Sequence, residues 1–365
     1  MDLKKIFVKN ACPTKIGGQA ILEGLMMKGA DQQAIAIRKP SGRIHLSVEP
    51  LAKPGKWKKI PVLRGVMVFV SALVQGTSIL LYSAEVLEQF TDEEGNPMFE
   101  KDRTTLWLEK HLGEKGALNA MLYLSVILAV LLTVGVFIIL PTWLIHSAKA
   151  WGGITNPVAL NALEGAVRIA MFVLYIRLVS GMQDIRKVFQ YHGAEHKTIH
   201  CYESGLELTP ENAQSFYALH PRCGTSFLMF VMVLSLLIFS MFGWPNLAVR
   251  ILSRLILIPF IAGLSYELLQ FTGRHDGPVV RFLSLPGIAL QTLTTKEPAM
   301  DQLEVAIVAM KAVMPENERA DDPCMSALPH GRYWVGEVDE DGCLHKDEEA
   351  TAAFRTRRKA QKESA

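Results

Sequence analysis

This sequence is poor in cysteine and in net charge, and both shortages narrow its class. The five cysteines are scattered over 365 residues, which is not the dense spacing of a disulfide framework. The net charge is only +2, so whole-protein electrostatics argue against nucleic acid as a partner. The opening stretch, MDLKKIFVKNACPTK, has a short apolar run and lacks the longer apolar core of a signal peptide. No glycine-rich loop of the kind that cradles phosphates is present.

What the chain does contain is long apolar segments. Residues 117–148 hold no Asp, Glu, Lys or Arg, and they exceed the roughly 20 residues that a helix needs to cross a bilayer. Three further segments, residues 157–180, 225–245 and 251–271, are candidates of similar length. The first of these three is weakened by three charged residues. The pattern predicts about four transmembrane helices.

A fifth uncharged block, residues 65–84, is less apolar, and its assignment depends on parity. Residues 1–64 carry 13 Lys and Arg, and the chain after residue 271 carries 12, so both ends are expected in the cytoplasm. Four spans put both ends on one side, whereas five would not. We therefore expect residues 65–84 to form an interfacial or re-entrant helix, or one packed on the bundle. A buried helix of a cytosolic domain is the alternative.

The expected fold is a polytopic α-helical membrane protein with a small α+β cytoplasmic module at its N-terminus. Residues 34–50, AIAIRKPSGRIHLSVEP, alternate around a Pro-Ser-Gly turn and predict a β-hairpin in this module. The expected parts are an N-terminal module (1–64), a helix with a polar linker (65–116), a four-helix membrane region with a cytoplasmic His-rich loop at 181–224 (117–271), a cytoplasmic helical segment (272–315), and a charged, partly disordered tail (316–365).

The His-rich loop contains the strongest chemical signal, YHGAEHKTIHCYE at residues 191–203. His192, Glu195 and His196 fit the pattern H-x-x-E-H, which on a helix lets both histidines reach one metal ion. Glu195 lies beside them and could take a proton from water at that metal. The sequence therefore predicts a divalent metal, zinc by preference, with Glu195 as the catalytic base. The competing interpretation is a polar helix that caps the bundle.

A catalytic zinc site needs a third protein ligand and an open position. Five residues near the motif or near the same membrane face could supply it: His200, Glu203, His220, Cys223 and Glu267. Cys223 and His220 lie in the short loop HPRCG and suit zinc by ligand type. Glu267 is notable because a carboxylate inside an expected membrane segment is costly and is a functional candidate for that reason.

Several long stretches resemble one known family. GGQAILEGLMMKG, AIAIRKPSGRI, YHGAEHKTIHCYE, HPRCGTSFL and LPGIALQTLTTKEP are similar to the YqhQ-like bacterial membrane proteins, a family of unknown function labelled as metal-dependent enzymes. The resemblance covers residues 15–315 and implies a multi-pass protein of the bacterial plasma membrane. Its metal label follows from the same histidine motif, so it adds no independent support.

Three functions remain open from the sequence. The leading one is a membrane-embedded metal-dependent hydrolase whose cytoplasm-facing site acts on a membrane-associated substrate. The second is a scaffold or regulatory protein that holds a structural metal and binds a partner protein in the bilayer. The third is a transporter component that uses Glu164, Arg168 and Glu267 along a polar path. Four protein ligands to the metal would favour the scaffold, and three would favour the enzyme.

Overall fold

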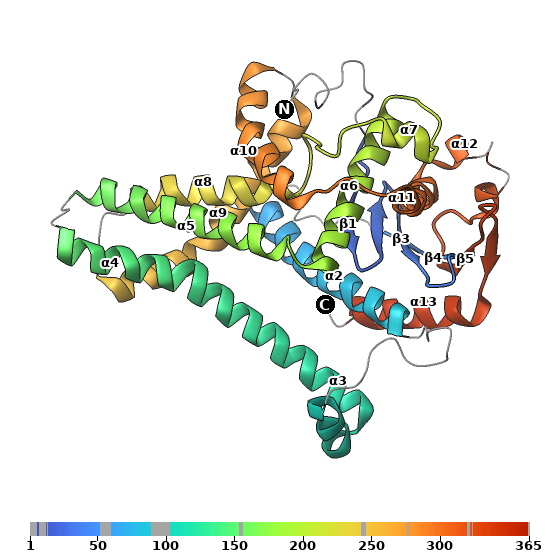
Figure 1. Cartoon of the computed structure of the whole chain (residues 1–365), viewed down its shortest axis with the longest axis horizontal. Helices are drawn as coiled ribbons and strands as arrows, with labels where there is room; N and C mark the ends of the chain where they lie inside the picture. The colour runs from blue at the N-terminus through green and yellow to red at the C-terminus, as the bar shows by residue number, and fades with distance from the viewer. Residues whose placement is uncertain are drawn as a thin grey trace.

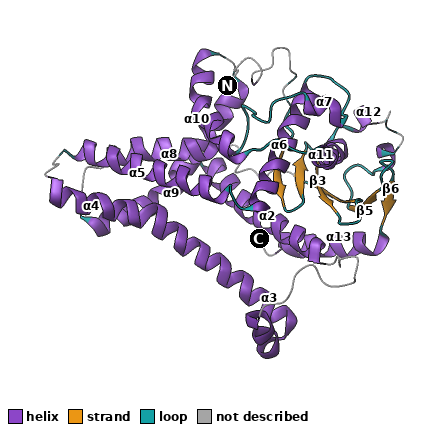
Figure 2. Ribbon diagram, viewed as in Figure 1, coloured by secondary structure: helices purple, strands orange, loops and turns teal. Residues whose placement is uncertain are grey.

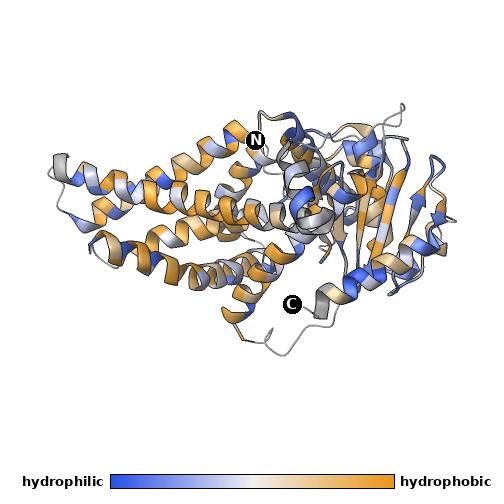
Figure 3. Ribbon diagram, turned by 90° about the horizontal axis from the view of Figure 1, so that it is seen from below, coloured by the Kyte–Doolittle hydropathy of each residue, from blue (hydrophilic) through white to orange (hydrophobic). Residues whose placement is uncertain are grey.

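The computed structural model divides the chain into a helical half and a half built around a β-sheet (Figures 1 and 2). It describes residues 14–51, 60–88, 103–152, 156–241, 246–275, 277–319 and 324–363, together with residues 6, 12 and 322. Figure 3 shows that the helical half is mostly apolar along its length, whereas hydrophilic segments gather in the sheet half. The chain is therefore mainly helical, and its hydrophilic residues are concentrated in the sheet half.

The sheet has six antiparallel strands in the order β1-β2-β3-β4-β5-β6. The strands are β1 (Gly17–Ile21), β2 (Gly24–Lys28), β3 (Gln32–Arg38), β4 (Ile44–Pro50), β5 (Trp334–Val338) and β6 (Leu344–Lys346). The β3–β4 pair, in which Ala34 lies opposite Val48, confirms the hairpin predicted over residues 34–50. Gly42 has a φ of 84° in its turn, a conformation that favours glycine.

Both faces of the sheet are covered, because alternate side chains of each strand point to opposite faces. Ala34 and Ala36 of β3 pack in the core that includes helices α6 (Gln183–Glu203) and α11 (Met300–Val313). Ile35 and Ile37 face the other way and pack against helix α2 (Leu63–Glu88). The nearly continuous apolar sequence of β3 follows from this two-sided burial.

The structure corrects the expected disorder of residues 316–365. Within this segment it describes α12 (Glu316–Arg319), the short helix η3 (Met325–Ala327), the strands β5 and β6, and α13 (Glu348–Glu363). Strand β5 pairs with β4, and Phe354 of α13 lies 5.2 Å from Tyr82 of α2, measured between ring centroids. The charged composition suggested disorder, but the tail folds because its few apolar residues dock on a surface made by distant parts of the chain.

The helical half consists of α3 (Arg103–Val134), η2 (Gly135–Ile139), α4 (Leu140–Gly152), α5 (Pro157–Val179), α8 (Thr225–Ser240), α9 (Leu247–Arg274) and α10 (Pro278–Thr294). Helix α2 joins the two halves. At its start, Gly65 packs so closely on Gly263 of α9 that a Cβ on Gly65 would lie 2.6 Å from the Gly263 carbonyl oxygen. Near its end, Ile79 and Val86 pack on the sheet.

The membrane-length helices differ from the four expected. By length and composition, three described segments could cross a membrane: Leu63–Leu87, Leu124–Lys149 and Leu247–Arg274. Leu124–Lys149 and Leu247–Arg274 match expected spans. Leu63–Leu87 contains the block 65–84, which the parity argument did not count as a span. Helix α5 does not qualify, and α8 is shorter than a typical span. The apolar helices suggest membrane association.

Helix α6 runs along the junction of the two halves. The helical conformation is interrupted at residues 180–182, between α5 and α6, so the histidine helix is not a continuation of α5. It ends at Ser204 and Gly205, as the sequence predicts, with Gly205 at a φ of 70°. The small helix α7 (Pro210–Gln214) and the loop 215–224 then lead into α8. This path returns the loop to the side of α6 that carries the histidines.

Candidate metal centre

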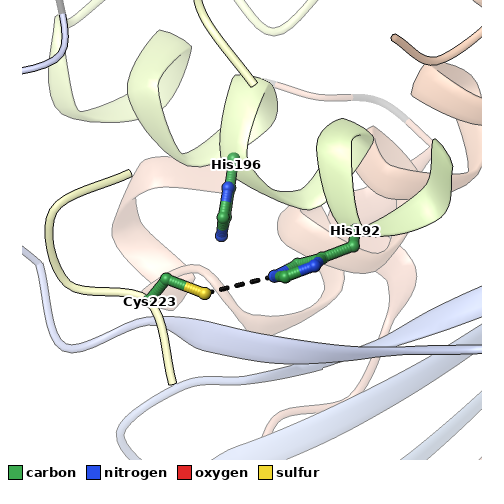
Figure 4. A group of neighbouring side chains, drawn as sticks. All are labelled: His192, His196 and Cys223. Atoms are coloured by element: carbon green, nitrogen blue, oxygen red, sulfur yellow. Dashed lines mark hydrogen bonds between the residues drawn. The ribbon is translucent and has the colours of Figure 1, made fainter. Parts of the chain in front are cut away.

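Three side chains converge where α6 meets the loop before α8. His192 and His196 lie one turn apart on α6, with ring centroids 4.4 Å apart, and Cys223 approaches from the loop (Figure 4). Each offers one ligand atom, and these atoms all lie within 4.8 Å of one another. Two imidazole nitrogens and one thiolate sulfur are a donor set that suits zinc. The H-x-x-E-H spacing therefore brings two candidate ligands together, and the loop before α8 places Cys223, a third candidate, beside them.

Hydrogen bonds to backbone carbonyls fix the tautomers of both histidines. Nδ1 of His192 lies 2.8 Å from the Thr294 carbonyl oxygen, and Nδ1 of His196 lies 2.6 Å from that of Ala218. Since a carbonyl oxygen only accepts, each Nδ1 carries the proton, which leaves each Nε2 with a lone pair. Nε2 of His196 is buried and has no hydrogen-bond partner. A buried acceptor of this kind fits the role of a metal ligand.

Cys223 lies within reach of both histidines. Its Sγ lies 3.2 Å from Nε2 of His192 and 3.2 Å from the Thr225 hydroxyl oxygen, and the Thr225 backbone N–H donates to it at 3.4 Å. These contacts fix the position of the sulfur, a ligand type that suits zinc. Thr225 was not singled out from the sequence, although it follows Cys223 by only two residues.

The other predicted ligands in this region support the loop instead. Nδ1 of His220 accepts from the Arg222 backbone N–H at 3.2 Å, so the proton of neutral His220 resides on Nε2, 3.7 Å from a Glu203 oxygen. His200 donates through Nε2 to the Leu219 carbonyl at 3.0 Å. Two hydrogen bonds at 2.9 Å join the Gln291 side chain to the His220 backbone. These contacts hold the loop against α6, which positions Cys223.

Glu203 also makes its contacts outside the candidate metal centre formed by His192, His196 and Cys223. It accepts from the backbone N–H of Thr14 at 2.8 Å and from the Thr14 hydroxyl at 3.0 Å, and it forms an ion pair with Arg222. Burial raises its pKa, but the nearby His220, the hydrogen bond from Thr14 and the charge of Arg222 outweigh burial and lower the pKa to about 2. Glu203 is therefore a buried, ionised anchor between the N-terminal segment and the loop.

Glu267 lies in a different place from the one expected of a ligand. It forms an ion pair with Arg64 and accepts from the Val62 backbone N–H at 3.2 Å, where the start of α2 packs on α9. Its charge is thus offset by a guanidinium rather than by a metal. The sequence singled out this carboxylate correctly as one that needs a partner, but it could not identify Arg64.

Glu195 lies beside the candidate metal centre and faces a cavity of about 270 Å³. The walls of this cavity include His196, Cys223 and the N-terminal segment from Thr14 to Gly18. The Gly18 backbone N–H donates to Oε1 of Glu195 at 2.7 Å, which fixes the carboxylate. Burial raises the pKa of Glu195, an effect that His192 and this hydrogen bond partly offset.

Two glycines allow the close contacts of the site, and neither role could be predicted from the sequence. A Cβ on Gly18 would lie 3.1 Å from the Glu195 carboxyl carbon and 2.3 Å from the Met26 carbonyl oxygen. A Cβ on Gly193 would lie 2.1 Å from the Lys296 carbonyl oxygen, so only glycine lets the segment after α10 approach α6. That approach places the Thr294 carbonyl beside His192.

Burial keeps the neighbouring imidazoles neutral. It is the largest cause that lowers the pKa of His196, and it lowers the pKa of His200 and of His220 to about 4. Metal binding requires the unprotonated ring nitrogen, so a neutral histidine avoids competition with protons. Protons therefore do not compete with a metal ion for these rings at neutral pH.

Comparison with known proteins places the chain in a family. Residues 60–316 match the family model described as "Protein of unknown function (DUF1385)". The chain is 36% identical over 317 residues to the "Uncharacterized protein YqhQ" of Bacillus subtilis (strain 168), an alignment that covers 84% of this chain and 94% of that protein. No solved structure matches.

Proposed function

The chain belongs to the DUF1385 family, and from its side-chain geometry we propose that it is a membrane-embedded, metal-dependent hydrolase. The observation that carries the proposal is the set of three buried or half-buried ligand atoms, from His192, His196 and Cys223, beside a cavity that also exposes Glu195. Three protein ligands leave a coordination position for water and substrate. A structural zinc site would have a fourth protein ligand, and among the described residues only three ligand atoms lie together, so the scaffold is the weaker candidate.

The chemistry assigns a task to each residue. A divalent metal supplies Lewis acidity, which lowers the pKa of water and polarises a carbonyl or phosphoryl group. His192 and His196 hold it through Nε2, and their Nδ1–H groups are fixed by the carbonyls of Thr294 and Ala218. Glu195, oriented by Gly18, accepts the proton of the attacking water and returns it to the leaving group.

The proposed topology keeps four spans, with both termini in the cytoplasm of a bacterial cell. Helix α2 is assigned to the cytoplasmic side because Ile79 and Val86, in its second half, pack on the sheet rather than on other membrane helices. The spans are then Leu124–Lys149, α5, α8 and α9. The metal centre lies just before α8 begins at Thr225, at the cytoplasmic membrane face, which favours a membrane-associated substrate.

Metal analysis of the detergent-purified protein tests the proposal. We expect about one zinc per chain, since the site offers a single set of three ligands. The double variant His192→Ala with His196→Ala should lose it, and His275→Ala, which changes an exposed histidine, should keep it. Glu195→Gln should retain the metal but abolish hydrolysis of a panel of fluorogenic peptide and ester probes. A wild-type protein that binds no metal after reconstitution would overturn the proposal.

A further inference from the structure

Two cysteines outside the candidate metal centre lie together in the C-terminal part of the chain. Cys324 directly precedes η3 and Cys343 directly precedes β6, and their Sγ atoms are 2.7 Å apart. Two sulfurs joined by a disulfide bond are about 2.0 Å apart, so bond formation requires a movement of less than about 1 Å. Neither sulfur is among the three ligand atoms of the candidate metal centre. The fold therefore brings together two thiols that are 19 residues apart in sequence.

Hydrogen bonds to two carboxylates hold the backbone of both cysteines in place. Oδ1 of Asp322 accepts from the backbone N–H of Cys324 at 3.1 Å and from that of Met325 at 3.0 Å. Oδ1 of Asp339 accepts from the backbone N–H of Cys343 at 2.8 Å, and the Asp339 N–H donates to the Cys343 carbonyl at 3.1 Å. Two groups that are held next to each other in this way react faster than groups that must first meet.

Both thiols can also be reached by a small oxidant. Cys324 and Cys343 are half-buried, whereas Cys201 and Cys223 are buried. Asp339, which contacts Cys343, lines a shallow hollow that has more carboxylates than cations: Glu337, Asp339, Glu340 and Asp341 against Lys39 and Arg43. Negative charge repels anionic oxidants such as oxidised glutathione and does not affect uncharged hydrogen peroxide. The surroundings therefore favour a peroxide as the oxidant.

We propose that Cys324 and Cys343 form a reversible disulfide, which tethers the segment before η3 to the β5–β6 hairpin. The loop that this bond closes contains the whole of β5, the strand that pairs with β4 (Figure 2 shows β5 and β6). Such a bond stabilises the fold because it restricts the unfolded chain. In the topology proposed above, this part of the chain lies in the cytoplasm, where disulfides that form are usually transient. The tether therefore responds to the redox state of the cell.

The chemistry balances over two steps. The Cys324 sulfur attacks one oxygen of hydrogen peroxide, the O–O bond breaks, and a sulfenic acid and one water are formed. The Cys343 sulfur then attacks the Cys324 sulfur, the S–S bond forms, and the hydroxyl group leaves with the Cys343 proton as a second water. The hydrogen bond with Cys324 is the largest cause that raises the pKa of Cys343 to about 11, so Cys343 keeps its proton until this step.

Peptide mapping of the full chain under non-reducing conditions tests the bond. The detergent-purified protein is reduced, treated with hydrogen peroxide, alkylated and digested. We expect a disulfide that joins the peptides of Cys324 and Cys343, and dithiothreitol should remove it. Cys343→Ser should form no such bond and should leave a sulfenic acid at Cys324, which dimedone labels. Cys12→Ser is the matched control, because it removes an exposed cysteine and should keep the bond.

Thermal unfolding measures the effect of the tether. Oxidised wild type should melt about 5 °C above reduced wild type, since the bond closes a loop around β5. Cys12→Ser should show the same difference and Cys343→Ser none. The melting temperatures of the reduced proteins show whether either substitution itself impairs folding. A wild type that forms no bond between Cys324 and Cys343, or a difference that persists in Cys343→Ser, overturns the proposal.

Discussion

The metal centre and the group of arginines around Glu164 both bury several nitrogen-bearing side chains, but the two regions tolerate burial by different means. In the sheet half, burial holds the pKa of His200 and of His220 near 4, so these rings are neutral. In the helical half, Arg250 and Arg254 stay charged and converge on Glu164. Neutral histidines leave a site open to a cation, whereas the arginines keep their charge and are held by ion pairs with Glu164. The chemistry of the side chains thus decides how each half accommodates burial.

The largest effect should come from removing the sulfur ligand of the metal centre. Cys223→Ala deletes one of three ligands and should weaken zinc binding by about 100-fold or more. Cys201→Ala is the matched control, because Cys201 is also a buried free thiol but contacts the Leu206 and Glu207 carbonyls instead. Zinc titration against a competing chelator measures both. Equal affinities in the two variants would remove Cys223 from the site.

In the helical half, the corresponding change is the loss of the shared carboxylate. Glu164→Gln leaves the guanidinium groups of Arg168, Arg250 and Arg254 without this counter-charge and should lower the free energy of unfolding by about 3 kcal/mol or more. The exposed Glu211→Gln should have little effect. Denaturant unfolding in detergent compares them. A Glu164→Gln protein as stable as wild type would show that the arginines are compensated by other means.

A third test uses pH, because the described part of the sheet half contains buried histidines whose pKa lies well below the ordinary value of a histidine. Burial, with a smaller effect of Lys39, lowers the pKa of His45 from 6.5 to about 4, and its Nε2 lies 3.0 Å from the Tyr82 hydroxyl. Below pH 6.5 the unfolded chain therefore binds a proton at His45, whereas the folded chain binds that proton only near pH 4. Stability is full above pH 6.5 and falls toward pH 4, by up to about 3 kcal/mol.

His45→Gln should flatten this dependence. Melting temperatures of wild type and variant, compared between about pH 7 and about pH 5, measure the difference in slope. The other buried histidines titrate in both proteins, so they cancel in the comparison. Parallel slopes would show that folding does not lower the pKa of His45.

The smallest effect on the metal should come from two carboxylates that the sequence proposed as ligands. Glu203→Gln and Glu267→Gln should keep the zinc content of wild type, because these groups pair with Arg222 and Arg64. Glu267→Gln should lower the melting temperature slightly, whereas Glu203→Gln removes a buried, ionised anchor and should lower it further. Loss of zinc in either variant would restore that residue as a candidate ligand.

Local patterns predicted local structure well. The hairpin at residues 34–50 and the end of α6 at Ser204 and Gly205 both depend on neighbouring residues, and both are present in the structure. His192 and His196 were placed correctly for the same reason, because helical spacing alone brings them together.

Long-range pairing is what the sequence could not determine. The sequence left five candidates for a third ligand, and Cys223 lies beside the two histidines because the loop 215–224 returns to α6. Likewise, the partner of Glu267 is some 200 residues away at Arg64. The contribution of β5 to the sheet was missed because its apolar residues are few and its partner strand lies near the other end of the chain.

The pairing of β4 with β5 has a consequence for how the protein is made. Strand β4 ends at Pro50 and β5 begins at Trp334, so the whole helical half is synthesised between two neighbouring strands of one sheet. A nascent chain leaves β4 as an open edge, a surface prone to pairing with other chains, until the last strands emerge. The sheet is therefore completed only after the apolar helices have left the ribosome.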